Sequence, residues 1–138
     1  MTRVFCSGCF DLGPHLGHLE LLEFARSLGD HLTVSVAADT TLRALKREPL
    51  LCEYDRCRLV GALRCVDTAF VARGEPSHRD CFPYVRTLRP DVWVIDADDP
   101  HRDEKERLAE ECGVRVALNY RPPCGVSTTG LLARIRGN

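Results

Sequence analysis

No stretch of this sequence comes near the run of about 18 apolar residues that marks a membrane-spanning helix. An excess of positive charge is also missing, since the formal net charge is -1. Broad binding to nucleic acid or to an anionic membrane needs a basic surface, so we expect neither kind of partner. The apolar run at the amino terminus is too short for a secretory signal, which predicts a cytoplasmic location. Any anionic ligand must then be held locally, by a few cations and by backbone N–H groups.

The chain has eight cysteines, and Cys6-x-x-Cys9 has the spacing of two zinc ligands. No second pair of cysteine or histidine residues follows at the distance found in zinc fingers. A structural zinc site needs four ligands, and this pattern supplies two. Without a secretory signal the thiols are expected to be reduced, several of them as small buried residues. The sequence therefore predicts no metal ion held by the chain itself.

Short β-branched runs alternate with amphipathic stretches along the 138 residues. The runs predict strands at 4–6, 32–37, 66–72, 92–95 and 114–118. The stretches between them predict helices at 17–29, 53–65, 78–88 and 101–112, a loop at about 40–52, and a last helix from residue 127. This order predicts a single α/β domain over residues 1–138, a Rossmann-like, doubly wound sheet of about five parallel strands with helices on both faces.

The loop after the first predicted strand carries two glycines, a proline and two histidines within 8–18. Ligands of such sheets bind beyond the carboxyl ends of the strands, so this loop is the first place to seek a site. His18 falls in the first helical turn, where free backbone N–H groups favour a phosphate. His15 lies three residues earlier, so that both rings can flank one anion, and Gly17 permits close approach of the backbone.

These residues resemble a known signature. Gly8-Cys9-Phe10-Asp11 followed by His15-x-Gly17-His18 is similar to the first motif of the cytidylyltransferase-like nucleotidyltransferase superfamily. A second motif of that superfamily, G-I-S-T-T, resembles the segment 125–129. Lys46 and Arg56 stand where related enzymes carry a phosphate-binding lysine and an arginine. The resemblance runs from about Val4 to Arg136.

The resemblance implies that a nucleoside monophosphate is transferred from a nucleoside triphosphate to a small phosphorylated acceptor such as a polyol or sugar phosphate. It implies catalytic roles for His15, His18 and Lys46 and a Mg²⁺ ion that accompanies the triphosphate. The nucleotide-binding residues it implies are Gly8, Cys9, Phe10, Asp11, Gly17, Arg64, Arg121, Gly125, Ser127, Thr128 and Thr129. The acceptor-binding candidates are Asp39, Arg56 and Asp98. Small relatives are usually homodimers, so a homodimer is expected.

The sequence departs from the family pattern in two places. Three residues separate Asp11 from His15 where the family has two, and Gly13-Pro14 predicts a turn that absorbs the extra one. After the fourth predicted strand, relatives often have a glycine, whereas this chain has the acidic segment 96–99. The second departure concerns the acceptor pocket and favours an unusual acceptor.

Two resemblances disagree about which base the nucleotide carries. The segment 63–67 resembles cytidylyltransferases, and Arg121 nearly matches an arginine that they carry before the second motif. Arginine donors suit the O2 and N3 acceptors of cytosine, which favours CTP over ATP. The first motif and the segment 127–136 instead resemble heptose-phosphate adenylyltransferases, which leaves ATP as the alternative. The alternative from another functional class is a nucleotide-binding module that has lost its catalytic activity.

Overall fold

A central parallel sheet forms the middle layer of the protein. The computed structural model describes residues 1–120 and 127–137. The five strands lie in the order β3-β2-β1-β4-β5, and every neighbouring pair is parallel. Their bounds are Arg3–Gly8 for β1, His31–Ala37 for β2, Thr68–Ala72 for β3, Val92–Asp96 for β4 and Arg115–Asn119 for β5. The predicted Rossmann-like architecture is confirmed.

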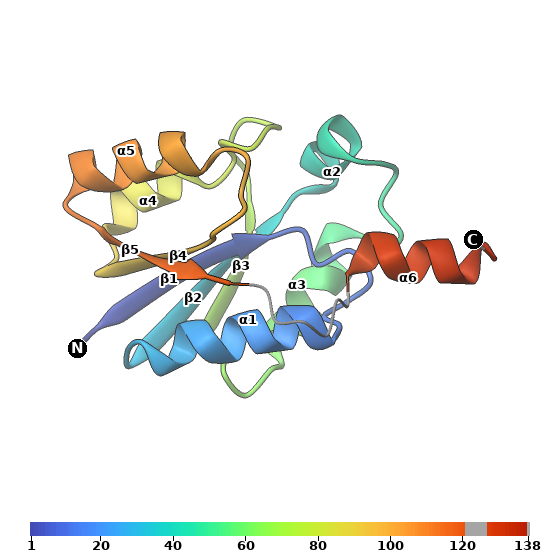
Figure 1. Ribbon diagram of the computed structural model, residues 1–138, viewed down its shortest axis with the longest axis horizontal. Helices are drawn as coiled ribbons and strands as arrows, with labels where there is room; N and C mark the ends of the chain where they lie inside the picture. Colours follow the sequence, from blue (N-terminus) through green and yellow to red (C-terminus); the bar gives the residue numbers. More distant parts are fainter. Residues whose placement is uncertain (121–126, 138) are drawn as a thin grey trace.

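Helices cover both faces of the sheet, as Figure 1 shows. The helices α1 (Leu16–Ser27) and α3 (Glu53–Gly61) lie on one face, and α4 (Phe82–Leu88) and α5 (Arg102–Cys112) lie on the other. The chain leaves β1 toward β2 and β3, then returns past β1 to form β4 and β5. The direction of winding therefore reverses between β1 and β4, where sheets of this kind bind their ligands.

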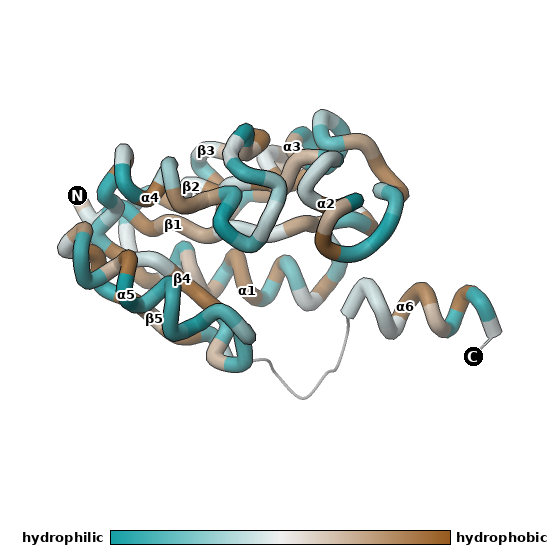
Figure 2. Tube along the Cα trace, turned by 90° about the horizontal axis from the view of Figure 1, so that it is seen from above, coloured by the Kyte–Doolittle hydropathy of each residue, from teal (hydrophilic) through white to brown (hydrophobic). Residues whose placement is uncertain are grey.

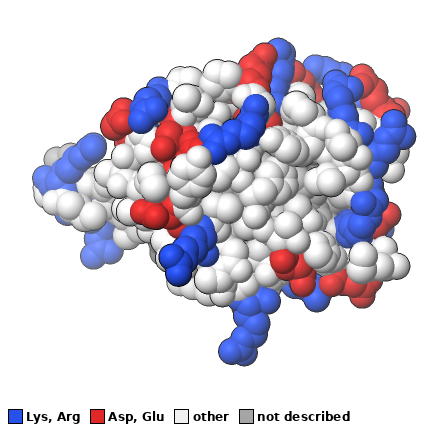
Figure 3. Space-filling view, turned by 180° about the vertical axis from the view of Figure 1, so that it is seen from behind, with Lys and Arg blue, Asp and Glu red and all other residues white. Residues whose placement is uncertain are grey.

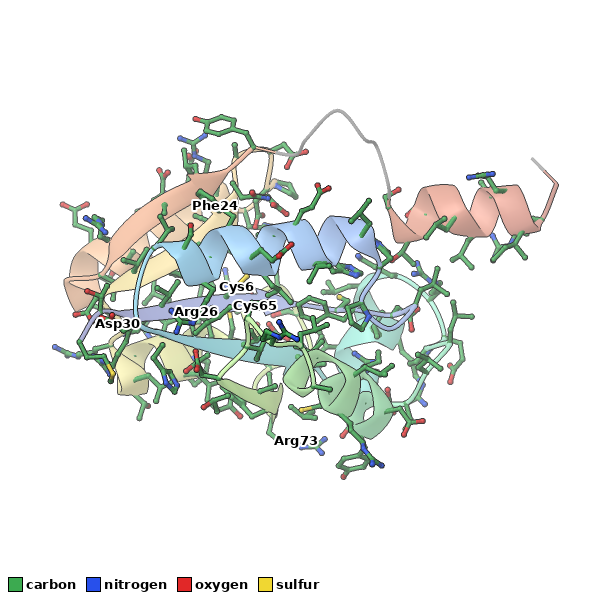
Figure 4. The ribbon with its side chains drawn as sticks, turned by 90° about the horizontal axis from the view of Figure 1, so that it is seen from below. Cys6, Phe24, Arg26, Asp30, Cys65 and Arg73 are labelled. Carbon is green, nitrogen blue, oxygen red and sulfur yellow. The ribbon has the colours of Figure 1, made fainter. Side chains whose placement is uncertain are left out.

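The strands are buried on both faces because their side chains alternate between two hydrophobic clusters. Val4 and Cys6 of β1 pack on the α1 side, where Figure 4 labels Cys6, and Phe5 packs beside Trp93 on the α4 side. Continuous apolar runs such as that of β4 are typical of parallel strands covered on both sides. The brown segments of Figure 2 follow these strands, whereas much of α5 and several connecting loops are teal. Figure 3 shows basic and acidic side chains interspersed on the face seen there.

One connection differs from the predicted loop at about 40–52. Its first half forms the helix α2 (Asp39–Leu45), in which Thr41 and Leu42 are buried. The threonine residues and the short length of this segment disfavour a helix. The burial of the two side chains outweighs that local preference. Lys46 is therefore the residue at which α2 ends, not the middle of a loop.

The last helix, α6 (Thr128–Ile135), has no buried residue among those described. Figures 1 and 2 both show it projecting from the end of the molecule at which α1 begins. None of the helices in the described ranges is long and apolar enough to cross a bilayer.

Arg56 of α3 ties the loops at the carboxyl edge of the sheet to one another. Its side chain is fully buried, and its guanidinium donates to the carbonyl oxygens of Cys9, Ala37 and Leu51 at 2.7–2.9 Å. It also forms an ion pair with Asp39, at 2.8 Å between Nη2 and Oδ1. The loop after β1, the end of β2 and the segment before α3 thus share one buried cation.

Replacing Arg56 with methionine is expected to lower the free energy of unfolding by about 3–5 kcal/mol. The substitution leaves a carboxylate and three carbonyl groups without their donor. The control is Arg58→Met on the same helix, where the side chain is exposed and the expected change is within about 0.5 kcal/mol. Urea unfolding measures both. Equal stability of the two variants would contradict the structural role of Arg56, and Arg56→Lys tests it if the methionine variant does not fold.

Candidate active site

A tight turn shapes the loop between β1 and α1. The N–H of Gly13 donates to the carbonyl of Phe10 at 3.1 Å, and both residues have positive φ, 61° and 54°. Glycine adopts this conformation without strain, and the turn accommodates the extra residue of the loop as the Gly13-Pro14 pair predicts. The turn brings His15 to the N-cap position of α1.

His15 and His18 cap α1 reciprocally. The Nδ1 atom of His15 accepts a hydrogen bond from the N–H of Gly17 at 3.1 Å, and the Nδ1 atom of His18 accepts one from the N–H of His15 at 3.2 Å. The two rings stack, with centroids 3.8 Å apart and planes 22° from parallel. A nitrogen that accepts carries no proton, so each neutral ring has its proton on Nε2. The helix cap therefore makes both Nε2 atoms hydrogen-bond donors.

Phe10 and Gly8 support the histidine pair by packing against His18 and against each other. The Phe10 ring is 1% exposed and meets His18 edge to face, with centroids 4.9 Å apart. A Cβ atom on Gly8 would lie 2.8 Å from the Phe10 ring, so only glycine leaves room for it. The first motif thus needs its glycine and phenylalanine for packing beneath the histidines.

Asp11 is also a supporting residue in this structure. Its carboxylate is buried, pairs with Arg47 at 3.1 Å and accepts the N–H of Leu50 at 2.9 Å. These contacts attach the segment after α2 to the histidine loop. Arg47 was not among the residues expected from the sequence, where it is one of many basic loop residues and carries no motif.

Lys46 is exposed and lies close enough to Cys9 for its charge to act on that thiol. Burial raises the pKa of Cys9 above its ordinary value, while Lys46 and Arg56 oppose that rise. Burial also raises the pKa of Cys6, to about 12. Both thiols of the Cys6-x-x-Cys9 pattern therefore stay protonated near neutral pH, which disfavours thiolate or metal chemistry there.

The carboxyl end of β4 is acidic, as the sequence indicates, but its carboxylates differ in their surroundings. Asp98 is exposed, whereas Asp96 accepts a hydrogen bond from Asn119 at 3.0 Å. Burial would raise the pKa of Asp99, but hydrogen bonds from Lys105, at 2.6 Å, and from the N–H of His101 lower it overall. Asp98 is therefore the acidic side chain of this segment best placed to meet a solute.

The structure keeps some of the expected site residues apart from the histidine loop. Arg64 precedes β3, so it lies at the amino edge of the sheet, roughly 16 Å or more from the carboxyl edge along a five-residue strand. Asp39 is at the carboxyl edge but is engaged by Arg56. Arg121 and Gly125 lie outside the described residues.

The second motif is described from Ser127 onward. Ser127 is the N-cap of α6, and its Oγ atom accepts a hydrogen bond from the N–H of Gly130 at 3.0 Å. Thr128 and Thr129 form the first turn that follows. A helix N-terminus with hydroxyl side chains can offer donors to a phosphate, and the phosphate-binding role of this motif stays a prediction.

Comparison with known proteins agrees with this geometry. The cytidylyltransferase-like family profile matches residues 5–134. An FAD synthase of Methanothermobacter thermautotrophicus is 38% identical, with 99% of this chain and 92% of the relative covered. The bifunctional protein HldE of Syntrophotalea carbinolica is 37% identical over 97% of this chain, which spans only 27% of that protein.

Solved structures share the fold. A lipopolysaccharide core biosynthesis protein from Thermoplasma volcanium has a TM-score of 0.73 and 31% identity, with 88% of this chain and 97% of that one covered. A pantoate-beta-alanine ligase from Francisella tularensis, at 14% identity and a TM-score of 0.63, has the fold alone in common. The comparisons do not confirm the expected preference for CTP. With its family profile matched over almost the whole sequence, the chain belongs to the cytidylyltransferase-like family of nucleotidyltransferases.

Proposed function

We propose that this protein transfers an adenylyl group from ATP to a small phosphorylated acceptor and releases pyrophosphate. The observation that carries the proposal is the histidine pair, in which the caps of α1 make both Nε2 atoms donors. A pair of donors at a helix N-terminus, after the central strand of a doubly wound sheet, suits the α-phosphate of a nucleotide.

In the proposed reaction, an oxygen of the acceptor phosphate attacks the α-phosphorus in line. The new P–O bond forms as the bond to the pyrophosphate oxygen breaks, so no covalent enzyme intermediate is needed. Negative charge builds on the α-phosphate and on the departing oxygen, where the Nε2–H groups of His15 and His18 stabilise it. Stabilisation by fixed donors of this kind costs no reorganisation at the moment of reaction.

Lys46 and the second motif are proposed to hold the rest of the triphosphate. The exposed ammonium of Lys46, at the end of α2, neutralises phosphate charge. Ser127, Thr128 and Thr129 contribute hydroxyl and N–H groups at the start of α6. Mg²⁺ is proposed to arrive on the triphosphate, because Asp11, the carboxylate of the histidine loop, is already engaged by Arg47 and Leu50.

ATP is preferred to CTP in this proposal for two reasons. FAD contains an adenylyl group, so the FAD synthases that resemble this chain over most of its length make an adenylylated product. Of the two arginines that favoured cytosine, Arg64 lies at the opposite edge of the sheet from the histidine pair. Cytidylyl transfer is the second candidate because the segment 63–67 resembles cytidylyltransferases.

The acceptor is proposed to be a flavin mononucleotide or a sugar phosphate, the two kinds that the relatives and the first motif suggest. Exposed Asp98 is the acceptor-side candidate that the structure leaves accessible, whereas Arg56 and Asp39 are proposed to act by holding the loops. A cytoplasmic location and a homodimer remain proposals.

Incubation with equal concentrations of ATP and CTP is expected to give a predominantly adenylylated product. The reaction is run with Mg²⁺ and with either flavin mononucleotide or a set of sugar and polyol phosphates. Mass spectrometry of the product and pyrophosphate release are the measurements. A cytidylylated product would overturn the base choice alone. Absence of pyrophosphate with every acceptor would favour the module that has lost its chemistry.

Replacement of His18 by asparagine separates its catalytic role from its capping role. The Oδ1 atom of asparagine replaces the Nδ1 acceptor for the N–H of His15, but the Nε2 donor is lost. The rate of transfer is expected to fall by about 10²–10³-fold while the melting temperature is kept.

The matched variant is His18→Gln, which keeps a donor near the Nε2 position and is expected to retain more of the activity than His18→Asn. His31→Ala, at the amino edge of the sheet, serves as the control and should leave the rate unchanged. Near wild-type turnover of His18→Asn at saturating substrate would refute the role of the Nε2 donor.

A further inference from the structure

His78, His101 and Glu104 come together outside the histidine loop, from two separate parts of the chain. His78 lies in the loop after β3, His101 immediately precedes α5, and Glu104 is in the first turn of α5. One ligand atom from each side chain lies within 4.8 Å of the other two, and all three residues are half-buried. We propose that this cluster binds a divalent transition-metal ion of the Zn²⁺ or Co²⁺ type.

The three side chains lie close enough together for one ion to join them once the two rings rearrange. The rings of His78 and His101 stack with centroids 3.6 Å apart and planes 9° from parallel. The Nε2 atom of His78 is 2.7 Å from Oε2 of Glu104, so an ion between them would replace a single hydrogen bond. Stacked rings hold their nitrogen lone pairs in parallel planes, so one imidazole must rotate out of the stack before both nitrogens can bind one ion at about 2.0–2.2 Å.

The donor set also indicates the class of ion. Two imidazole nitrogens and one carboxylate oxygen suit zinc and its neighbours in the first transition series. Magnesium and calcium prefer sites made of oxygen atoms, so the site differs in kind from the Mg²⁺ expected on the triphosphate. Three protein ligands leave at least one coordination position for water or a phosphate oxygen.

Arg79 supports the carboxylate and also limits the affinity of the site. Its Nε atom lies 2.5 Å from Oε1 of Glu104, which orients the carboxylate and leaves Oε2 toward His78. The same guanidinium places a positive charge beside the proposed ion. On α5, Lys105 is 2.6 Å from Asp99, which offsets its charge.

A metal ion here would fasten the loop after β3 to the start of α5. Cysteine spacing by itself predicts no metal ion in this chain. The signal that it passes over is His101-x-x-Glu104, a spacing that places two ligands on adjacent turns of one helix, with His78 added only by the fold.

The test is titration of the full-length, chelator-treated protein with Co²⁺ alone, under reducing conditions, with the visible d–d absorption as the signal. One Co²⁺ per chain is expected, without the thiolate-to-cobalt charge-transfer band that cysteine ligation gives. His78→Ala, His101→Ala and Glu104→Gln are each expected to weaken binding by at least about tenfold. His31→Ala is the control and should bind as the unmodified protein does, and Zn²⁺ should displace the Co²⁺.

A fourth variant separates the proposed site from adventitious binding. Arg79→Ala removes the competing cation and is expected to tighten Co²⁺ binding by several fold. The proposal is overturned by any one of three results: no Co²⁺ binding at millimolar concentration, a thiolate charge-transfer band, or equal binding by the three ligand variants. None of these readouts depends on nucleotidyl transfer, so they test the metal site independently of the proposed reaction.

Discussion

The burial of the Arg56 guanidinium is the constraint on which the carboxyl edge of the sheet depends. A guanidinium taken out of water needs every donor satisfied, and here three carbonyl groups and one carboxylate supply the acceptors. These acceptors come from the loop after β1, the end of β2, the start of α2 and the segment before α3. Because one cation requires all four, the loop that carries the histidines cannot move independently of its neighbours.

The histidine pair shows how a local folding rule can set a chemical property. A helix needs acceptors for its first N–H groups, and serine or aspartate usually supplies them. Here two imidazole Nδ1 atoms do so, which places the ring protons on Nε2. The same hydrogen bonds therefore start α1 and prepare two donors for an anion. A ring with two nitrogens performs both tasks with one side chain.

The strands, their parallel direction and the histidine loop could be predicted from the sequence because hydrophobic periodicity and chain connectivity determine them. The segment 39–45 could not, since the helix α2 depends on burial of Thr41 and Leu42 that no local pattern reveals. Arg56 was expected to bind the acceptor. Its burial depends on acceptor groups that are distant in the sequence, which no local pattern reveals. Arg64 was expected at the nucleotide, and it precedes β3 at the amino edge of the sheet, a position that its motif alone does not show.

Charge around the histidine loop is balanced almost residue by residue, in keeping with the formal net charge of -1. Arg47 is neutralised by Asp11 and Arg56 by Asp39, so these cations add little to the field that a ligand meets. What remains are directional donors at the start of α1 and the exposed ammonium of Lys46. Attraction at long range is consequently weak, and binding depends on close contact with the donors. Selectivity for a phosphate chain then follows from geometry, since a solute without oxygens at those positions leaves the donors unpaired.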